Sequence, residues 1–312
     1  MRVLVTGVAG FLGSSLAETL RAQGIEVRGV DAFTPNYDPA RKRANLSRLL
    51  RDPGFQLEEV DLRIAPPGSV LGGATHVVHL AALPGVRPSW GESFRAYAEH
   101  NILVTQRLLE AIPRGRAVER VVVASSSSIY GAPTRLPTPE DELPRPISPY
   151  GVTKLATEAL VHAYRHERFL PAVSLRYFTV YGPRQRPDMG FHRFFEAARR
   201  GEPVTVYGDG RQTRDFTYVD DAVSATIAAL TRPVPEVAYN VGGGNRVSLN
   251  EVLDTMGRIV GRPIERKHVE PQPGDPRDTA SDTRLARRDL GFEPRTALEE
   301  GLRKQWEWQR NP

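Results

Sequence analysis

The first 177 residues alternate between short apolar runs and longer stretches in which apolar positions recur at helical spacing. Such alternation is typical of an α/β fold in which helices cover a parallel, doubly wound sheet. Helices are expected after Gly13, near 40–51, within 90–111 and from Tyr150 to about 168. The strands are expected at Arg2–Thr6, Glu26–Val30, Gln56–Val60, His76–Ala81, Arg120–Ser125 and Ala172–Tyr177.

The pattern beyond residue 177 is less regular, and we interpret this part of the chain as a smaller lobe that closes over a substrate. No internal repeat or low-complexity segment interrupts it. The expected elements are a helix near 191–200, a strand at Val204–Tyr207, a helix from about 219, a strand at Val237–Val241, and helices near 248–260 and 297–310.

A glycine-rich turn joins the first strand to the first helix and predicts a dinucleotide site. Gly7, Gly10 and Gly13 stand where backbone N–H groups can approach a pyrophosphate at a helix N-terminus. Asp31 ends the second strand, where a carboxylate accepts hydrogen bonds from ribose hydroxyls and repels a 2′-phosphate. The unit therefore favours NAD over NADP, although Asp31 alone is also compatible with an ordinary strand-end turn.

A serine run, a tyrosine and a lysine form the clearest catalytic pattern. Ser126 belongs to the run ASSSSIYG, and Tyr150 and Lys154 follow in SPYGVTK. Ser148 and Pro149 predict the start of a helix, so Tyr150 and Lys154 share one of its faces. A nearby ammonium lowers the pKa of a tyrosine from roughly 10, which lets the phenol accept a hydroxyl proton. A Y-x-x-x-K pattern alone is common by chance and is compatible with an exposed helical pair.

Composition excludes several classes of function. The 312 residues carry a formal net charge of +5 and contain no cysteine, which rules out disulfides, thiol nucleophiles and cysteine-ligated metals. The basic residues are scattered apart from residues 41–43, so nucleic acid is not expected as a partner. No metal site is expected. The chain opens in its first strand without a signal peptide or membrane span, so a cytoplasmic location and no membrane partner are expected.

Several motifs in order give the chain a family resemblance. TGVAGFLG, Asp31, HLAA, SSSS, PYGVTK and RYFTVYGP resemble the extended short-chain dehydrogenases that modify nucleotide sugars, over essentially the whole chain. The resemblance implies a Rossmann-type doubly wound parallel sheet with a smaller C-terminal α/β substrate lobe. The implied NAD-binding domain is 1–177, with 214–244 returning to it, and the implied nucleotide-sugar lobe is 178–213 and 245–312. A homodimer seamed by the helices near 95–111 and 150–168 is also implied.

The resemblance assigns roles to individual residues. Tyr150 would accept the sugar hydroxyl proton, Lys154 would bind the nicotinamide ribose and lower the tyrosine pKa, and Ser126 would hydrogen-bond the reacting hydroxyl. Asp61 and Leu62 match the pair lying against the adenine, and Ala81 lines the cofactor cleft. The implied NAD contacts are Gly7, Gly10, Phe11, Leu12, Gly13, Asp31, Asp61, Leu62, Ala81, Tyr150 and Lys154.

The resemblance also extends into the second lobe. Arg214 and Arg277 match the arginines that hold the diphosphate of the sugar nucleotide, and a guanidinium fork suits phosphate oxygens. Each arginine is equally compatible with a structural ion pair to a neighbouring aspartate, such as Asp215 or Asp278. Thr179 stands where many relatives carry asparagine, which leaves a contact to the sugar ring as an alternative to one with phosphate.

The serine run bears on the reaction. Decarboxylases and 4,6-dehydratases of this family carry acidic residues where this chain has Ser127 and Ser128. Without a carboxylic acid there, dehydration lacks a group that protonates the departing hydroxyl, whereas C4 epimerisation needs only the tyrosine, the lysine and NAD. An alternative interpretation of the two serines is a hydrogen-bonded strand-to-loop turn.

Three local segments resemble UDP-glucuronate 4-epimerases in particular, namely 36–49, 84–90 and 181–191. Ser127, Ser128 and Thr179, with Arg186 or Arg87, are expected to hold the substrate carboxylate in an orientation that prevents loss of CO2, although Arg186 is also compatible with a surface loop charge. UDP-glucuronate 4-epimerisation is therefore the favoured interpretation. The alternatives are a UDP-glucuronate decarboxylase, a UDP-glucose 4-epimerase and a catalytically silent NAD-sensing protein.

Overall fold

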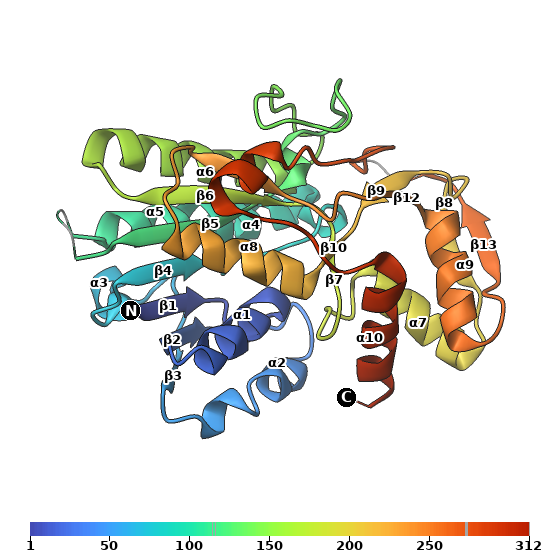
Figure 1. The fold of residues 1–312 in the computed structure, drawn as a ribbon, viewed down its shortest axis with the longest axis horizontal. Helices are drawn as coiled ribbons and strands as arrows, with labels where there is room; N and C mark the ends of the chain where they lie inside the picture. The colour runs from blue at the N-terminus through green and yellow to red at the C-terminus, as the bar shows by residue number, and fades with distance from the viewer. Residues whose placement is uncertain (114, 116, 272–273, 312) are drawn as a thin grey trace.

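The computed structural model describes residues 1–113, 115, 117–271 and 274–311. Within them, seven parallel strands form one sheet in the order β11-β6-β5-β4-β1-β2-β3 (Figure 1). The predicted Rossmann-type sheet is therefore confirmed. Its strands are β1 (Arg2–Thr6), β2 (Glu26–Asp31), β3 (Phe55–Glu59), β4 (His76–His79), β5 (Arg120–Ser126), β6 (Ala172–Tyr177) and β11 (Ala238–Val241).

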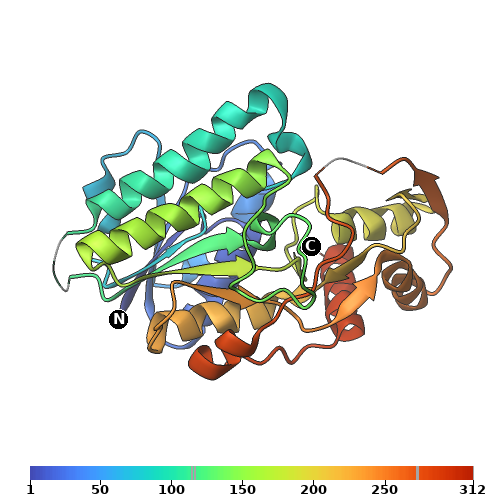
Figure 2. The same ribbon diagram turned by 90° about the horizontal axis from the view of Figure 1, so that it is seen from above.

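Alternation along the strands divides the core between the two faces of the sheet. In β1, Val3 and Val5 belong to one apolar cluster and Leu4 to the other, and all three are fully buried. Helices α1 (Phe11–Ala22) and α8 (Val219–Thr231) cover the first face. On the second face, α5 (Val104–Ala111) and α6 (Pro149–Arg168) run side by side (Figure 2), next to α3 (Pro67–Leu71).

The strand order reverses between β1 and β4, and this reversal positions the site. From β1 the chain winds outward to β2 and β3, and it then returns to β4 on the other side of β1. Connections leave the two neighbouring strands in opposite directions, so a crevice opens at their carboxyl ends. Thr6 and His79 are paired at that edge, and the glycine turn follows Thr6 directly.

Helix α6 starts as its capping sequence predicts. The Ser148 side chain accepts a hydrogen bond from the Gly151 N–H at 3.1 Å, and Pro149 occupies the first turn. The helix then runs to Arg168 and ends at Phe169, which has a φ of 54°. Tyr150 and Lys154 are therefore held in its first two turns.

The second half of the chain forms small sheets between helices. Two-residue strands β7 (Val180–Tyr181) and β10 (Thr217–Tyr218) pair with each other. Strand β8 (Val204–Tyr207) pairs with β13 (Arg266–Val269), and β9 (Thr213–Asp215) pairs with β12 (Arg246–Ser248). Helices α7 (Gly190–Arg200), α9 (Leu249–Val260) and α10 (Leu298–Arg310) pack together beside them (Figure 1).

Shorter helical segments complete the fold. Helix α2 (Pro39–Asn45) is shorter than the predicted 40–51 helix, and a 3₁₀ turn follows it. Helix α4 (Phe94–Tyr97) continues through a π-helical segment into α5, so the predicted helix within 90–111 is present with an irregular centre. The 3₁₀ segments are Leu49–Arg51, Arg87–Ser89, Gly91–Ser93 and Ser127–Ile129, and the π segments are Ala98–Leu103 and Ala286–Leu290.

The chain crosses back to the central sheet after residue 213. Strand β11 lies beside β6, and α8 packs against α1. The predicted domain boundaries are not tested by these placements and stay a prediction. Of the helices in the described residues, none is both long and apolar enough to traverse a lipid bilayer.

Candidate active site

One cavity of about 950 Å³ lies at the carboxyl edge of the sheet and extends toward the smaller sheets. This volume is near the upper end for small-molecule sites, which reach roughly 1,000 Å³. Every candidate residue from the sequence lines it, whereas their individual roles stay predictions. They are Gly7, Gly10, Phe11, Leu12, Gly13, Asp31, Asp61, Leu62, Ala81, Arg87, Ser126, Ser127, Ser128, Tyr150, Lys154, Thr179, Arg186, Arg214 and Arg277.

The glycine turn has the geometry that a pyrophosphate needs. Gly7 has a φ of 69°, and a Cβ atom at Gly13 would lie 2.2 Å from the Gly7 oxygen. Gly10 caps α1 without a side-chain hydrogen bond, and no acidic residue stands in the first turn. The N–H groups at this helix end can therefore serve an anion, which fits the diphosphate of a dinucleotide.

Asp31 is fixed at the end of β2 by two backbone donors. The Ala9 N–H donates to Oδ2 at 3.0 Å, and the Phe33 N–H donates to Oδ1 at 2.8 Å. Each carboxylate oxygen keeps a second acceptor position, because an ionised carboxylate offers about four lone-pair sites. The group is therefore oriented and still able to accept ribose hydroxyls, so these residues fit NAD.

Asp61 is held by Arg63 through a two-point ion pair. Arg63 Nη2 lies 2.6 Å from Oδ2, and Nε donates to Oδ1 at 3.1 Å. The side-chain hydrogen bond from Arg63 lowers the pKa of Asp61, so its charge persists near neutral pH. On the facing wall, the Ala81 N–H donates to Thr6 Oγ1 at 3.3 Å, which anchors the segment after β4 to β1.

Tyr150, Lys154 and Ser126 meet where α6 crosses the end of β5. The Ser126 hydroxyl is hydrogen-bonded to the Tyr150 side chain. Lys154 Nζ donates to the Ala124 carbonyl at 2.8 Å, and the tyrosine's own N–H donates to Ser89 Oγ at 3.1 Å. The structure thus brings the three predicted catalytic residues together.

The pKa of Tyr150 shifts in the opposite direction to the one expected from the sequence. Burial raises it, while the hydrogen bond from Ser126 and the charge of Arg186 act to lower it. The Lys154 ammonium is directed to a backbone carbonyl, and burial lowers the pKa of Lys154 to about 8 against the opposing effect of Glu158. The free-energy cost of removing the phenolate from water is therefore larger than the stabilisation that Ser126 and Arg186 provide.

The serine run presents a row of hydroxyls to the cavity. The Oγ atoms of Ser126 and Ser128 lie 3.1 Å apart, Ser126 Oγ accepts the Ser128 N–H at the same distance, and Ser127 opens a 3₁₀ turn. The turn interpretation of these serines is therefore realised, and their hydroxyls still line the cavity. Thr179 lies between β6 and β7, where its carbonyl accepts the Thr217 N–H at 2.9 Å.

Two candidate carboxylate-binding arginines are paired with aspartates. Arg186 donates from Nε and Nη2 to Asp188 at 3.0 and 2.9 Å. Arg87 donates to Asp275 at 3.0 Å, and its guanidinium lies 4.0 Å from the ring centre of Tyr207. Both arginines can therefore exchange an aspartate for a ligand carboxylate or phosphate.

Arg214 and Arg277 converge on the far end of the cavity. Arg214 Nη1 donates to the carbonyls of Thr213 and Arg277, at 2.9 and 3.0 Å. Burial lowers the pKa of Arg214, and Arg277 pairs with Asp209 at 3.0 Å. Asp278, considered from the sequence as an ion-pair partner, instead pairs with Arg246 at 3.0 Å.

Sequence reasoning did not single out several residues of the cavity wall. Asp188 and Asp275 hold the arginines described above, and Lys42 is buried with its Nζ donating to Asn36 Oδ1 at 2.8 Å. Lys42 and Asp188 lie in segments that resemble UDP-glucuronate 4-epimerases, which was the available signal. No group of three His, Asp or Glu side chains in the part of the chain that the structure describes is arranged to hold a metal ion.

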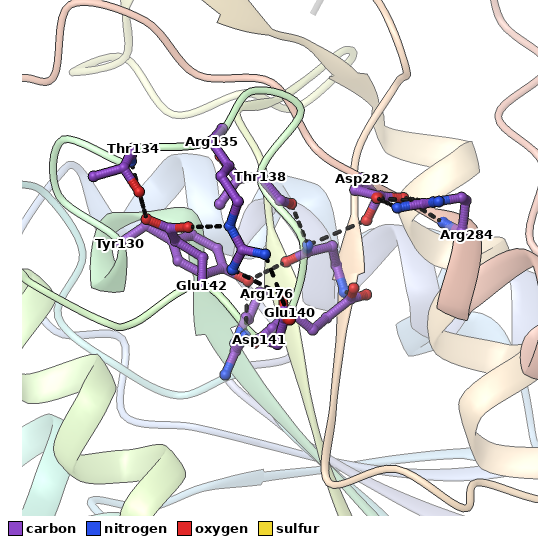
Figure 3. A network of polar contacts seen from close by, with 11 residues as sticks. Tyr130, Thr134, Arg135, Thr138, Glu140, Asp141, Glu142, Arg176, Asp282 and Arg284 are labelled. Carbon is purple, nitrogen blue, oxygen red and sulfur yellow. Dashed lines mark hydrogen bonds and ion pairs between the residues drawn. The ribbon is translucent and has the colours of Figure 1, made fainter.

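A buried polar network supports the strand end behind the serine run (Figure 3). Arg176 Nη1 donates to the Tyr130 hydroxyl at 2.7 Å and to the Glu140 carbonyl at 2.8 Å. The Tyr130 hydroxyl in turn donates to Asn240 Oδ1 at 2.7 Å. The network joins β6, β11 and the loop after the serines.

Comparison with known proteins agrees with this site. The profile of the NAD dependent epimerase/dehydratase family matches residues 3–242. A Bacillus subtilis protein named as an uncharacterized UDP-glucose epimerase, YtcB, is 42% identical over 97% of this chain and 96% of its own length. A UDP-glucuronate 4-epimerase of Thermodesulfobacterium geofontis is 37% identical over 98% of this chain and 95% of its own.

A solved structure gives the same result in three dimensions. The UDP-glucuronic acid 4-epimerase from Bacillus cereus, in complex with UDP-glucuronic acid and NAD, superimposes with a TM-score of 0.94 at 39% identity, and the match covers 99% of each chain. The predictions of family and of NAD as cofactor are confirmed. The chain belongs to the NAD dependent epimerase/dehydratase family, and within it to the NAD-dependent UDP-sugar 4-epimerases.

Proposed function

We propose that the protein interconverts UDP-glucuronate and UDP-galacturonate by epimerisation at C4. The observation that carries this proposal is the position of Arg186, which lines the cavity of Tyr150 and whose charge opposes the rise that burial causes in the tyrosine's pKa. A cationic fork beside the base and a row of serine hydroxyls provide the donors that a sugar carboxylate needs. The names of the relatives from Thermodesulfobacterium and Bacillus cereus support the same substrate.

In this proposal Tyr150 accepts the proton of the C4 hydroxyl while Ser126 hydrogen-bonds the same oxygen. Bound NAD supplies a reversible hydride acceptor for the sugar carbon. Lys154 stabilises the charged tyrosine and orients the cofactor ribose. Arg214 and Arg277 bind the diphosphate, so the 4-keto sugar can rotate about that link and be reduced on its opposite face.

The acidic sugar presents a particular risk, because oxidation at C4 produces a β-keto acid that readily loses CO2. Ser127, Ser128 and Thr179, together with Arg186 or Arg87, are proposed to hold the carboxylate out of alignment with the carbonyl π system. The same donors replace the water molecules that the carboxylate loses on binding, so it stays ionised. The absence of an acidic side chain at Ser127 and Ser128 argues against the decarboxylase and dehydratase alternatives.

A neutral substrate is the second candidate. The printed name of the Bacillus subtilis relative is that of a UDP-glucose epimerase. In addition, Asp188 already neutralises Arg186 in this structure. A catalytically silent NAD sensor is disfavoured because Tyr150, Lys154 and Ser126 are assembled as a reactive unit.

The partition of the chain and its assembly are part of the proposal. Residues 1–177 with 214–244 would bind NAD, and 178–213 with 245–312 would bind the nucleotide sugar. Large apolar side chains remain exposed along α4, the segment after it and α6, which favours a cytoplasmic homodimer joined by these helices. They include Phe94, Leu103 and Val152, with exposed fractions of 39%, 55% and 44%.

Separate incubations of the purified protein with NAD and either UDP-glucuronate or UDP-glucose, followed by proton NMR, test the function. UDP-galacturonate formed without CO2 is the expected result. UDP-xylose would replace the proposal with decarboxylation, and turnover of UDP-glucose alone would favour the neutral epimerase. If neither UDP-sugar were converted, the interpretation as a catalytically silent NAD-sensing protein would be favoured.

A further inference from the structure

A buried ion pair behind the catalytic helix has no part in the mechanism described so far. Glu158 and Arg176 are 7% and 7% exposed, and Arg176 Nε and Nη2 donate to the Glu158 carboxylate at 3.0 and 2.8 Å. Taking two such charges out of water costs several kcal/mol per ion, and an apolar pair of similar volume is often as stable. Stability alone therefore does not explain why a buried ion pair stands at this position.

Helix geometry relates Glu158 to the catalytic residues. Tyr150, Lys154 and Glu158 are spaced four residues apart on α6 and so share one face of the helix. The same face contacts three consecutive residues at the end of β5: Glu158 accepts the Ser125 hydroxyl, Lys154 donates to the Ala124 carbonyl and Tyr150 is hydrogen-bonded to Ser126.

We infer that Glu158, held by Arg176, is a positioning residue that keeps Lys154 charged and fixes the strand end that carries Ser126. The Glu158 carboxylate lies one helical turn beyond Lys154, where its negative charge favours the ammonium form. Its bond to Ser125 fixes the residue immediately before the catalytic serine. This inference rests on the roles proposed above for Tyr150, Lys154 and Ser126, but not on the identity of the sugar.

The other charged and titratable groups around Lys154 do not replace this effect. His79 faces it from β4, and burial together with the Lys154 charge lowers the pKa of His79 to about 3, so the imidazole is neutral. Arg176 on β6 is directed to Glu158, Tyr130 and the Glu140 carbonyl. Glu158 is therefore the carboxylate that offsets the loss of hydration of Lys154.

The sign of the expected effect follows from these charges. Burial lowers the pKa of Lys154 to about 8, and Glu158 raises it. In Glu158→Gln, Lys154 loses its proton at lower pH, so the alkaline limb of the kcat profile moves down by about one pH unit. Activity at pH 9 then falls by about ninefold, whereas activity at pH 7 falls by only about twofold.

The test compares pH profiles of kcat, measured with whichever UDP-sugar the wild type converts, for four variants. In Glu158→Gln, the alkaline limb of the kcat profile should move to lower pH. Glu158→Gln combined with Arg176→Met should keep the shift while removing the unpaired guanidinium, and Glu158→Asp should restore the wild-type profile at least in part. Glu142→Gln is the matched control, because Glu142 is an equally buried carboxylate bound to Arg135.

A titration without substrate separates this inference from the proposed function. The ultraviolet absorbance of tyrosinate, taken as the difference from a Tyr150→Phe variant with NAD bound, should show that Tyr150 ionises at higher pH in Glu158→Gln. If the pair has only a structural role, Glu158→Gln should have lower thermal stability and the double variant should recover it. The pH profiles of kcat should then be those of the wild type in both variants. Unchanged kinetic and spectroscopic titrations would overturn the inference, whichever sugar is used.

Discussion

Two regions hold their charged groups in different ways: the sheet region, residues 1–177 and 214–244, and the region proposed to bind the nucleotide sugar, residues 178–213 and 245–312, called here the substrate region. Lys154, in the sheet region, is 5% exposed and its Nζ atom is fixed to a backbone carbonyl. The side chain of Arg277, in the substrate region, is 64% exposed and pairs with the half-exposed Asp209. Exposed pairs contribute little to stability, so Arg277 can change partners at small cost, whereas Lys154 is in place before a ligand arrives.

This difference separates two tasks. Proton and hydride transfer require fixed distances, which a buried helix face against a parallel sheet provides. Recognition of a diphosphate and a carboxylate requires groups that leave one partner for another, as Arg186 and Arg277 can leave Asp188 and Asp209. We therefore expect changes in the sheet region to affect kcat for every sugar, and changes in the substrate region to affect selectivity.

The largest expected effect belongs to the sheet region. Tyr150→Phe removes the proposed base, and kcat should fall by about 10³-fold for acidic and neutral UDP-sugars alike. NAD content, measured by absorbance after protein denaturation, should remain that of the wild type, because the phenyl ring keeps the packing of the tyrosine. Residual activity within tenfold of the wild type would contradict the assignment of the base.

A smaller and more selective effect is expected from Arg186→Ala. Loss of a charge-assisted contact of about 2–3 kcal/mol should lower kcat/KM for UDP-glucuronate by roughly 50-fold, and much less for UDP-glucose. The ratio of the two kcat/KM values is the measurement. Arg48→Ala, an exposed arginine outside this cavity, serves as the control. Equal losses of kcat/KM for both sugars would show that Arg186 does not bind the carboxylate, and would weaken the contrast between the regions.

The smallest effect concerns stability and pH. Burial lowers the pKa of His79 to about 3, below its ordinary value near 6.5, so the unfolded chain binds the proton first. The contribution is fully present above about pH 6.5 and is lost at about 1.4 kcal/mol per pH unit as the pH falls toward 3.

Urea unfolding at pH 6.5 and 5.5 measures this loss. His79→Asn should remove the His79 component of the difference, whereas His268→Asn, at an exposed position on β13, should leave the difference as it is in the wild type. An identical pH dependence in wild type and His79→Asn would show that the buried imidazole does not resist protonation.

The two regions also differ in how far their structure could be predicted. Strand β5 is buried on both faces, so Val121, Val122 and Val123 form a continuous apolar run that is visible without a partner. Strands β7 and β10 are two residues long and exist because they pair with each other across more than thirty intervening residues. Nothing local in either sequence predicts that pairing.

The site shows the same limit. Tyr150 and Lys154 could be placed together because helix spacing and capping fix their geometry locally, whereas Ser126 was assigned by family resemblance. Asp188 and Asp275 could not, because an exposed aspartate in a loop gives no sign of the arginine it will meet. The direction of the Tyr150 pKa shift was predicted wrongly, since it depends on burial by segments far away in the sequence.

Strand β11 has a consequence for how the molecule is made. It occupies an edge of the central sheet, yet its residues, Ala238–Val241, follow most of the first substrate-region segment in the chain. During synthesis, the open side of β6 stays unpaired until the sixty residues 178–237 have been made and β11 begins to emerge. Completion of the sheet region is thus delayed until part of the region proposed to bind the sugar already exists, which makes an independently folding N-terminal fragment ending at β6 a candidate for edge-to-edge aggregation.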